Sequence, residues 1–83
     1  MEILWYDEFL TQKQVELYVA IKEFIEEKKY SPSVRELCNI LNKKSTGTID
    51  AGLKLLKRKG YIDFEVGKNR TLQITKDVKY EKH

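Results

Sequence analysis

The chain has 83 residues, with 16 lysines and arginines against 13 acids and 41% hydrophobic residues, which allows one domain with a modest core. A single cysteine and a single histidine exclude a disulfide framework, a zinc finger and a Cys/His catalytic pair, so we expect no metal, no cofactor and no enzymatic activity. The apolar runs are too short to span a membrane, and acids stand where a signal peptide would carry bases, so we expect a cytoplasmic protein.

Positive charge is concentrated in the middle of the chain. Residues 31–60 hold seven lysines and arginines against two acids, whereas residues 1–10 hold three acids and no base. This layout attracts a polyanion to the middle segment. A lysine-rich helix face that is merely solvated would give the same pattern, so charge alone leaves both interpretations open.

The stretch "LTQKQV" predicts the start of a helix, because Thr11 can act as a cap with Gln14 as its partner. Apolar residues then recur at helical spacing until the charged run "EEKKY", which predicts an end near residue 28 or 29. Val15 and Val19 form a second apolar row that is expected to lie off the core face.

Two further helices follow. In "YSPSVREL", Pro32 cannot continue the first helix, and Ser33 with Glu36 forms a capping box for a short second helix. Cys38 is expected to be a small core residue on that helix rather than a reactive thiol. The third helix is predicted to begin at a Ser45 or Thr46 cap and to bury the row Ile49, Leu53 and Leu56.

The third helix is expected to stop at Gly60, and Gly52 within it to permit close packing against a neighbouring helix. Beyond Gly60 the period changes to two, so "YIDFEV" and "TLQIT" predict a hairpin with "GKNR" as its turn. The inward residues of that hairpin should be Ile62, Phe64, Leu72 and Ile74. The tail "KDVKYEKH" has no clear period and is expected to fray.

This order of elements predicts an α+β fold, a winged helix-turn-helix of three helices followed by a two-stranded antiparallel β-hairpin. A DNA major groove about 12 Å wide admits one helix, whose first residues then reach the base edges. The predicted division is an apolar and acidic extension, a winged-helix domain and a tail: residues 1–9, 10–76 and 77–83.

Two stretches resemble a known family: "LTQKQVELYVAIKEFIEEKKYSPSVRELCNIL" and "STGTIDAGLKLLKRKGYIDFEVGKNRTLQIT" are similar to the amino-terminal DNA-binding domain of the LexA repressors, over about residues 10–75. The features that match in order are the leading Leu-Thr, the proline before the capped second helix, the "LKLLKRKG" close of the third helix, and a wing with Gly67 and Arg70. The resemblance implies a small transcriptional regulator or repressor, of bacterial or phage type, that binds double-stranded DNA with the third helix in the major groove and the wing on the backbone or in the minor groove.

Family members carry a self-cleaving peptidase domain after this one, and 83 residues leave no room for it, so self-cleavage is not expected of this sequence. The base-reading segment of the family begins with a serine, which Ser45 matches. The sequence departs from the family pattern at residues 47–51, so we expect a different operator. Asp50 is open to two interpretations, as a base reader that accepts from cytosine or as a partner that orients Lys54.

The predicted DNA-binding residues are grouped around the third helix and the wing, with lysines and arginines as phosphate ligands and small polar residues as base readers. They are Ser33, Lys43, Lys44, Ser45, Thr46, Gly47, Thr48, Asp50, Lys54, Lys59, Lys68, Asn69 and Arg70.

The extension "MEILWYDEF" carries more apolar surface than proteins usually leave bare. One hypothesis is that it folds back over the Val15 and Val19 row. The other is a homodimer contact made by the extension and that row, through Ile3, Leu4, Trp5, Phe9, Val15 and Val19. The main alternative to DNA binding is a winged-helix module for protein–protein interaction in a transcription, phage or plasmid complex.

Overall fold

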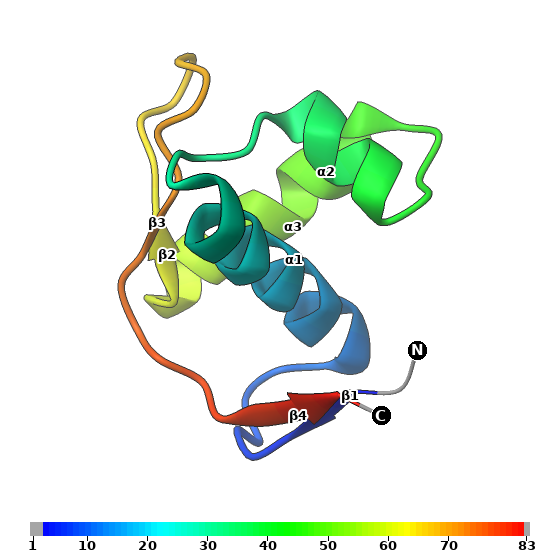
Figure 1. Cartoon of the computed structure of the whole chain (residues 1–83), viewed down its shortest axis with the longest axis vertical. Coiled ribbons are helices and arrows are strands. Elements are labelled where there is room, and N and C mark those ends of the chain that lie inside the picture. The colour runs from blue at the N-terminus through cyan, green and yellow to red at the C-terminus, as the bar shows by residue number, and fades with distance from the viewer. Residues whose placement is uncertain (1–2, 83) are drawn as a thin grey trace.

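The computed structural model describes residues 3–82, so residues 1, 2 and 83, at the outer ends of the predicted extension and tail, lie outside the described residues. In chain order the elements are β1 (Ile3–Trp5), α1 (Gln12–Lys28), α2 (Val34–Ile40), α3 (Thr46–Lys59), β2 (Ile62–Asp63), β3 (Gln73–Ile74) and β4 (Tyr80–Lys82). Figure 1 shows the three helices packed together, with the β2–β3 wing rising on one side and the β1–β4 sheet below. The predicted winged helix-turn-helix is confirmed. No helix in this part of the chain is long and apolar enough to cross a membrane.

Each helix begins at a predicted cap. The Thr11 hydroxyl accepts from the Gln14 amide, and the Gln14 side chain accepts from the Thr11 amide at 3.0 Å. Ser33 and Glu36 form the same box at the start of α2. Ser45, rather than Thr46, caps α3 by accepting from the amide of the second helical residue at 3.2 Å. These caps satisfy backbone donors that have no partner inside the helix, and so fix where each helix starts.

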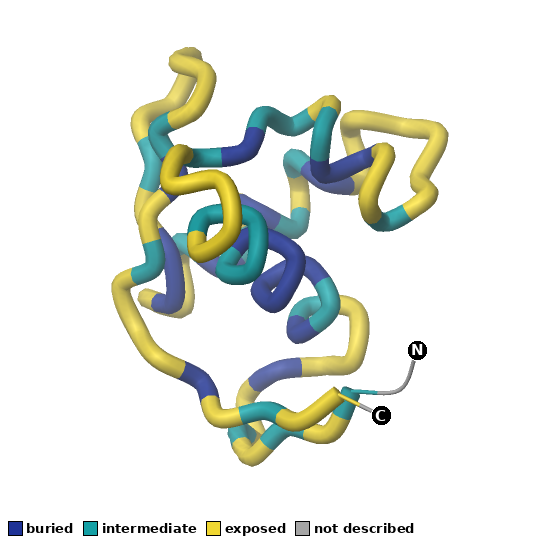
Figure 2. Tube along the Cα trace, in the orientation of Figure 1, coloured by how far each residue is buried: buried dark blue, intermediate teal, exposed yellow. Residues whose placement is uncertain are grey.

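The core lies where α1 crosses α3, and it includes the predicted row Ile49, Leu53 and Leu56. Figure 2 shows the buried residues of α1 along the middle of that helix. Gly52 is the point of closest approach, because a Cβ there would lie 2.7 Å from Leu17 Cδ2. The predicted packing role of Gly52 is therefore confirmed, and it holds α3 at a fixed depth against α1.

The wing is an antiparallel pair in which Ile62 lies opposite Ile74. Its strands have two residues each, and most of the segment between them is an exposed loop. Ile62 and Leu72 are buried, and Phe64 packs at the edge of the core, as predicted. The wing is thus fixed at its base and open at its tip.

The prediction that the tail frays is wrong. β4 pairs antiparallel with β1, with Ile3 opposite Lys82 and Trp5 opposite Tyr80. Val78, just before β4, is buried, and its amide donates to the Tyr18 hydroxyl at 3.1 Å. Strands of three residues give no readable alternation, so their pairing across the whole chain has no signal in the local pattern.

The extension folds back against α1, which was the first of the two hypotheses. Trp5 is partly buried against the core, and its indole N–H donates to the Leu10 carbonyl at 3.1 Å. The expectation that Val15 and Val19 lie off the core face is wrong, because both are buried within a single chain. They are covered by their own chain and are not free to form a contact between subunits. Phe9 stays 68% exposed.

Candidate nucleic-acid interface

The outward side of α3 begins with small residues. Thr46, Gly47, Thr48 and Ala51 are all exposed. The opposite side of the helix is buried in the core, which fixes the rotation of α3 about its axis. A helix with small outward residues can approach the floor of a major groove closely, so its backbone and hydroxyl groups reach base edges.

A groove separates the amino ends of α2 and α3 from the wing. Its lining includes predicted site residues from all three elements, together with Val34 and Arg35. The predicted residues that it brings together are Ser33, Thr46, Gly47, Asp50, Asn69 and Arg70. Residues 33 and 69 are distant in sequence, so it is the packing of the wing beside α2 that places them on one surface.

Three cations around the start of α3 are uncompensated, and one of them, Arg35, lines the groove. The side chains of Arg35, Lys43 and Lys44 make no hydrogen bond or ion pair with any residue of the 3–82 range. Lys43 and Lys44 lie in the α2–α3 connection, most of which Figure 2 shows exposed. Unpaired cations flanking an exposed helix start are suited to neutralising phosphates.

Arg35 lines the groove but was not among the predicted site residues. It follows the Ser33 cap by two residues and is exposed. Arg35 lies in the basic middle segment, so its charge was visible, but its position beside α3 depends on how α2 packs.

Asp50 and Lys54 form an ion pair at 3.0 Å on the surface of α3. Each side chain is about half exposed, at 49% and 58%. This geometry matches the interpretation in which Asp50 orients Lys54. An exposed pair one helical turn apart is worth only about 0.3–0.5 kcal/mol, so the base-reading role of Asp50 remains a prediction.

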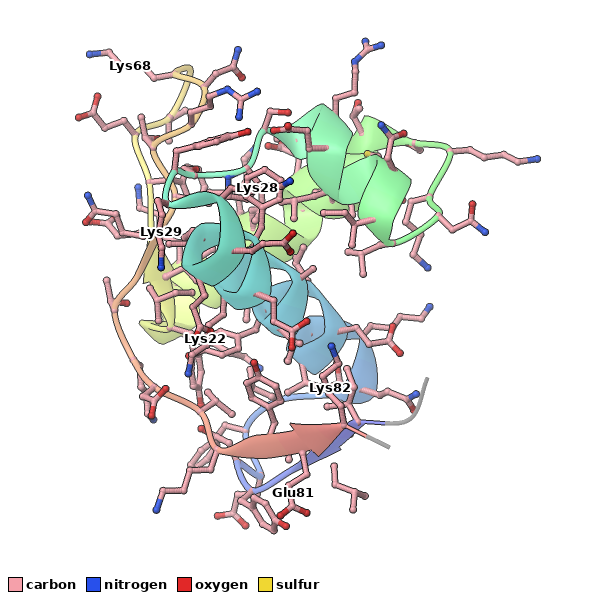
Figure 3. The ribbon with its side chains drawn as sticks, viewed as in Figure 1. Lys22, Lys28, Lys29, Lys68, Glu81 and Lys82 are labelled. Carbon is pink, nitrogen blue, oxygen red and sulfur yellow. The ribbon has the colours of Figure 1, made fainter. Side chains whose placement is uncertain are left out.

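Lys68 stands at the tip of the wing. Figure 3 shows its side chain pointing away from the body of the molecule. Its ammonium lies 3.1 Å from Glu65, but the Lys68 side chain is 71% exposed. Such an exposed pair is weak enough for a phosphate to replace the carboxylate. Asn69, next to it, is also exposed.

Arg70 is held against the rest of the domain. Its guanidinium donates to Glu36 at 2.8 Å and to the Ser31 carbonyl at 3.1 Å, and it lies 5.2 Å from the centre of the Tyr30 ring. The pKa of Glu36 is lowered, first by the Ser33 amide N–H and also by Arg70. Arg70 therefore links the wing to α2, unlike the free cations beside it.

Lys59 does not join the other predicted residues. Its ammonium donates to the Phe9 carbonyl at 2.7 Å and to the Gln14 side chain at 3.0 Å. It ends α3, about 20 Å along the helix from Thr46 at 1.5 Å per residue. Lys59 therefore fastens the amino-terminal extension to the carboxyl end of α3.

Comparison with known proteins gives one consistent family. The family model described as the LexA DNA binding domain matches residues 7–71. A LexA repressor of Caldicellulosiruptor saccharolyticus is 44% identical over 71 residues, which are 86% of this chain and 35% of the relative. A LexA repressor of Clostridium novyi is 45% identical over 65 residues, 78% of this chain and 32% of the relative. The "Transcription regulator LexA" of Synechocystis is 39% identical over 65 residues, again 78% and 32%. The chain thus spans about a third of the length of these curated relatives.

Proposed function

Since the chain belongs to the LexA DNA-binding domain family, we propose that it binds double-stranded DNA in a sequence-specific manner as part of a cytoplasmic transcriptional regulator. The observation that carries this proposal is the exposed start of α3, whose small residues are flanked by the uncompensated Arg35, Lys43 and Lys44. In this function the domain acts by binding and not by catalysis.

We assign each DNA contact from the chemical character of the side chain that makes it. The amino end of α3 enters the major groove, where the Ser45, Thr46 and Thr48 hydroxyls pair with donors or acceptors of the bases. The cations beside it neutralise phosphates of the strands that border the groove. Lys68 and Asn69, at the wing tip, meet the backbone or the adjacent minor groove.

The Asp50–Lys54 pair carries part of the proposed specificity. A carboxylate accepts from the amino group of cytosine but repels phosphates. Asp50 lies in the groove between the amino ends of the helices and the wing, with Lys54 3.0 Å away to compensate its charge. Replacing Asp50 with Asn should therefore change the preferred base at one position of each half-site more than it changes overall affinity.

Selection of bound duplexes from a random pool tests the proposal directly. We expect a recurring sequence and an affinity for it that falls steeply with salt, with a slope of about −0.9 for each neutralised phosphate. Recovery of no preferred sequence, together with affinity that does not depend on salt, would contradict DNA binding and would favour a module for protein interaction.

A homodimer is a second part of the proposal, favoured by the exposed apolar side chains of Leu4 in β1 and of Tyr6 and Phe9 after it. Two copies would match the two half-sites of a palindromic operator. Sedimentation of the unaltered chain and of the Leu4→Ser, Phe9→Ser variant tests this. We expect the variant to lose association at micromolar concentration, and a monomeric unaltered chain would contradict the dimer.

A further inference from the structure

An arginine of the wing bonds it to the segment that leads into α2. Arg70 Nη1 lies 2.8 Å from Glu36 Oε1 in α2 and 3.1 Å from the Ser31 carbonyl oxygen. A second bond joins the same two segments, because the Leu72 amide donates to Ser31 Oγ at 3.0 Å. The wing therefore has a defined attachment beyond its own strand pair.

Glu36 serves both sides of this attachment. The same Oε1 atom accepts from the Ser33 amide at 2.9 Å, which closes the capping box of α2. The carboxylate is thus placed by the start of α2, and Arg70 binds it in that position. Because α2 packs against α3, the position of the wing is coupled to the helix-turn-helix unit.

The other side of the Arg70 guanidinium faces an aromatic pair. It lies 5.2 Å from the centre of the Tyr30 ring, a distance typical of a cation–π contact. Tyr30 packs edge to face on Phe24 of α1, with ring centres 5.4 Å apart. Arg70 is therefore held between the end of α1 and the start of α2.

The backbone of Arg70 is consistent with this constraint. Its φ is 58°, in the left-handed region that residues with a side chain seldom adopt. Such a conformation persists where surrounding contacts hold it. The bonds to Glu36 and Ser31 supply those contacts here.

We propose that Arg70 and Glu36 are positioning residues for DNA binding: they fix the angle of the wing relative to α3, and Lys68 and Asn69 at the tip make the backbone contacts. This inference rests on the proposed function. A wing already oriented in the free protein loses less conformational freedom when DNA binds, so affinity depends on the pair although neither side chain touches phosphate.

The salt dependence of binding separates this role from that of a phosphate ligand. Removing a phosphate ligand reduces the slope of log affinity against log salt by about 0.9, whereas removing a positioning residue leaves the slope unchanged. Replacing Glu36 distinguishes the two roles by the direction in which the affinity for DNA changes. If Arg70 bound phosphate, Glu36→Gln would release it and raise affinity; if the pair orients the wing, affinity falls. Gln also closes a capping box, so α2 keeps its start.

The experiment measures binding of the selected duplex by fluorescence anisotropy, over a salt series, for Arg70→Gln, Glu36→Gln and the double variant. We expect each single variant to weaken binding about fivefold with an unchanged slope, and the double variant to be no weaker than Arg70→Gln. Lys68→Gln is the matched control for a phosphate ligand and should reduce the slope by about 0.9. Glu65→Gln is the matched control for loss of an acid on the wing and should not weaken binding.

A measurement without DNA completes the test. Amide hydrogen exchange at Leu72 should be about fivefold faster in Arg70→Gln and Glu36→Gln, and unchanged in Lys68→Gln, with core amides unaffected. Unchanged exchange at Leu72, or a slope reduced by about 0.9 in Arg70→Gln, would overturn the positioning role. Failure of the unaltered chain to bind any duplex would instead overturn the proposed function, and the exchange at Leu72 distinguishes the two results.

Discussion

The helix-turn-helix unit, α2 with α3, and the terminal sheet, β1 with β4, both carry lysines in or beside them, but they differ in what those lysines contact. In the α2–α3 connection, Lys43 and Lys44 have no partner among residues 3–82. Near the terminal sheet, Lys82 lies 2.7 Å from Glu23, and Lys22 pairs with Asp77. Figure 3 shows Lys82 turned toward α1 and Glu81 on the other side of β4. We therefore propose that DNA meets the uncompensated charge around the start of α3, and an exposed lysine beside the terminal sheet serves to test this against total charge.

The largest effect is expected from removing two of these free cations. Arg35→Gln with Lys44→Gln should reduce the salt slope by about 1.8 and weaken binding at low salt about 100-fold, because each side chain neutralises one phosphate. Anisotropy with the selected duplex measures both quantities.

Lys79→Gln is the matched control, since Lys79 is an exposed lysine next to β4. It should leave the slope unchanged. An equal effect of Lys79→Gln would show that binding depends on total charge and not on the cations around the start of α3.

The second effect concerns the crossing of α1 and α3, which joins the helix-turn-helix unit to the part of the molecule that carries the terminal sheet. Gly52→Val should lower the free energy of unfolding by about 2–3 kcal/mol, because its side chain meets Leu17 in a packed core. Ala51→Val, the exposed neighbour on the same helix, should cost only about 0.5 kcal/mol of helix propensity. Urea denaturation of both variants measures the difference, and equal losses would contradict the close approach at Gly52.

The features that were predicted correctly from the sequence depend on signals close to them in the chain. The caps at Thr11, Ser33 and Ser45 and the stop at Gly60 were predicted, because each signal lies within four residues of its effect. The buried row of α3 was predicted for the same reason, since a helical period is visible in one short segment.

What the sequence did not predict depends on distant pairing. The β1–β4 pairing joins residues almost 80 positions apart, so nothing in the tail segment itself indicated that it would be ordered. Arg70 and Lys59 were assigned to the DNA surface by their charge. The partner of Arg70, Glu36, lies in another element, and the contacts of Lys59 with Phe9 and Gln14 follow from the folded extension. For these two residues the sequence showed the charge but not the contacts that compensate it.

The third effect tests how the terminal side is held. The Tyr61 hydroxyl is bonded to the Asp7 carboxylate at 2.5 Å, and Tyr61 is buried. Tyr61→Phe should lower the free energy of unfolding at neutral pH by about 1–2 kcal/mol, because it removes a hydrogen bond to a charged group. Thermal unfolding measures this loss.

The same tyrosine gives an alkaline signature. Burial, followed by the bond to Asp7, raises the pKa of Tyr61 from 10.0 to about 12. The folded state therefore keeps the Tyr61 proton up to a higher pH than the unfolded state does. The stability that this gives is full below pH 10 and is lost as pH rises toward about 12. Tyr61→Phe should make this loss shallower, and an unchanged alkaline profile would contradict the Tyr61–Asp7 bond.

The smallest effect is expected at acid pH. The pKa of Asp7 is lowered below 3.8, first by the Tyr61 hydroxyl and then by the Phe9 amide. The stability that this gives is present above pH 3.8 and is lost as pH falls through the lowered value. Asp7→Asn should therefore flatten the pH dependence of stability below pH 4, with a change of less than about 1 kcal/mol. A denaturation series from pH 6 to pH 2 tests this.

The pairing of Ile3 with Lys82 makes the domain almost a closed loop. Residues opposite each other in an antiparallel pair have Cα atoms only about 5 Å apart, so a short glycine linker could join Lys82 to Ile3 without bending either strand. New ends could then be opened between Gly67 and Lys68, at the exposed tip of the wing. Figure 1 shows β1 and β4 at the far end of the long axis from that tip. A reporter attached at β1 or β4 would therefore sit clear of the wing, whereas the rearranged chain would carry it to the wing tip.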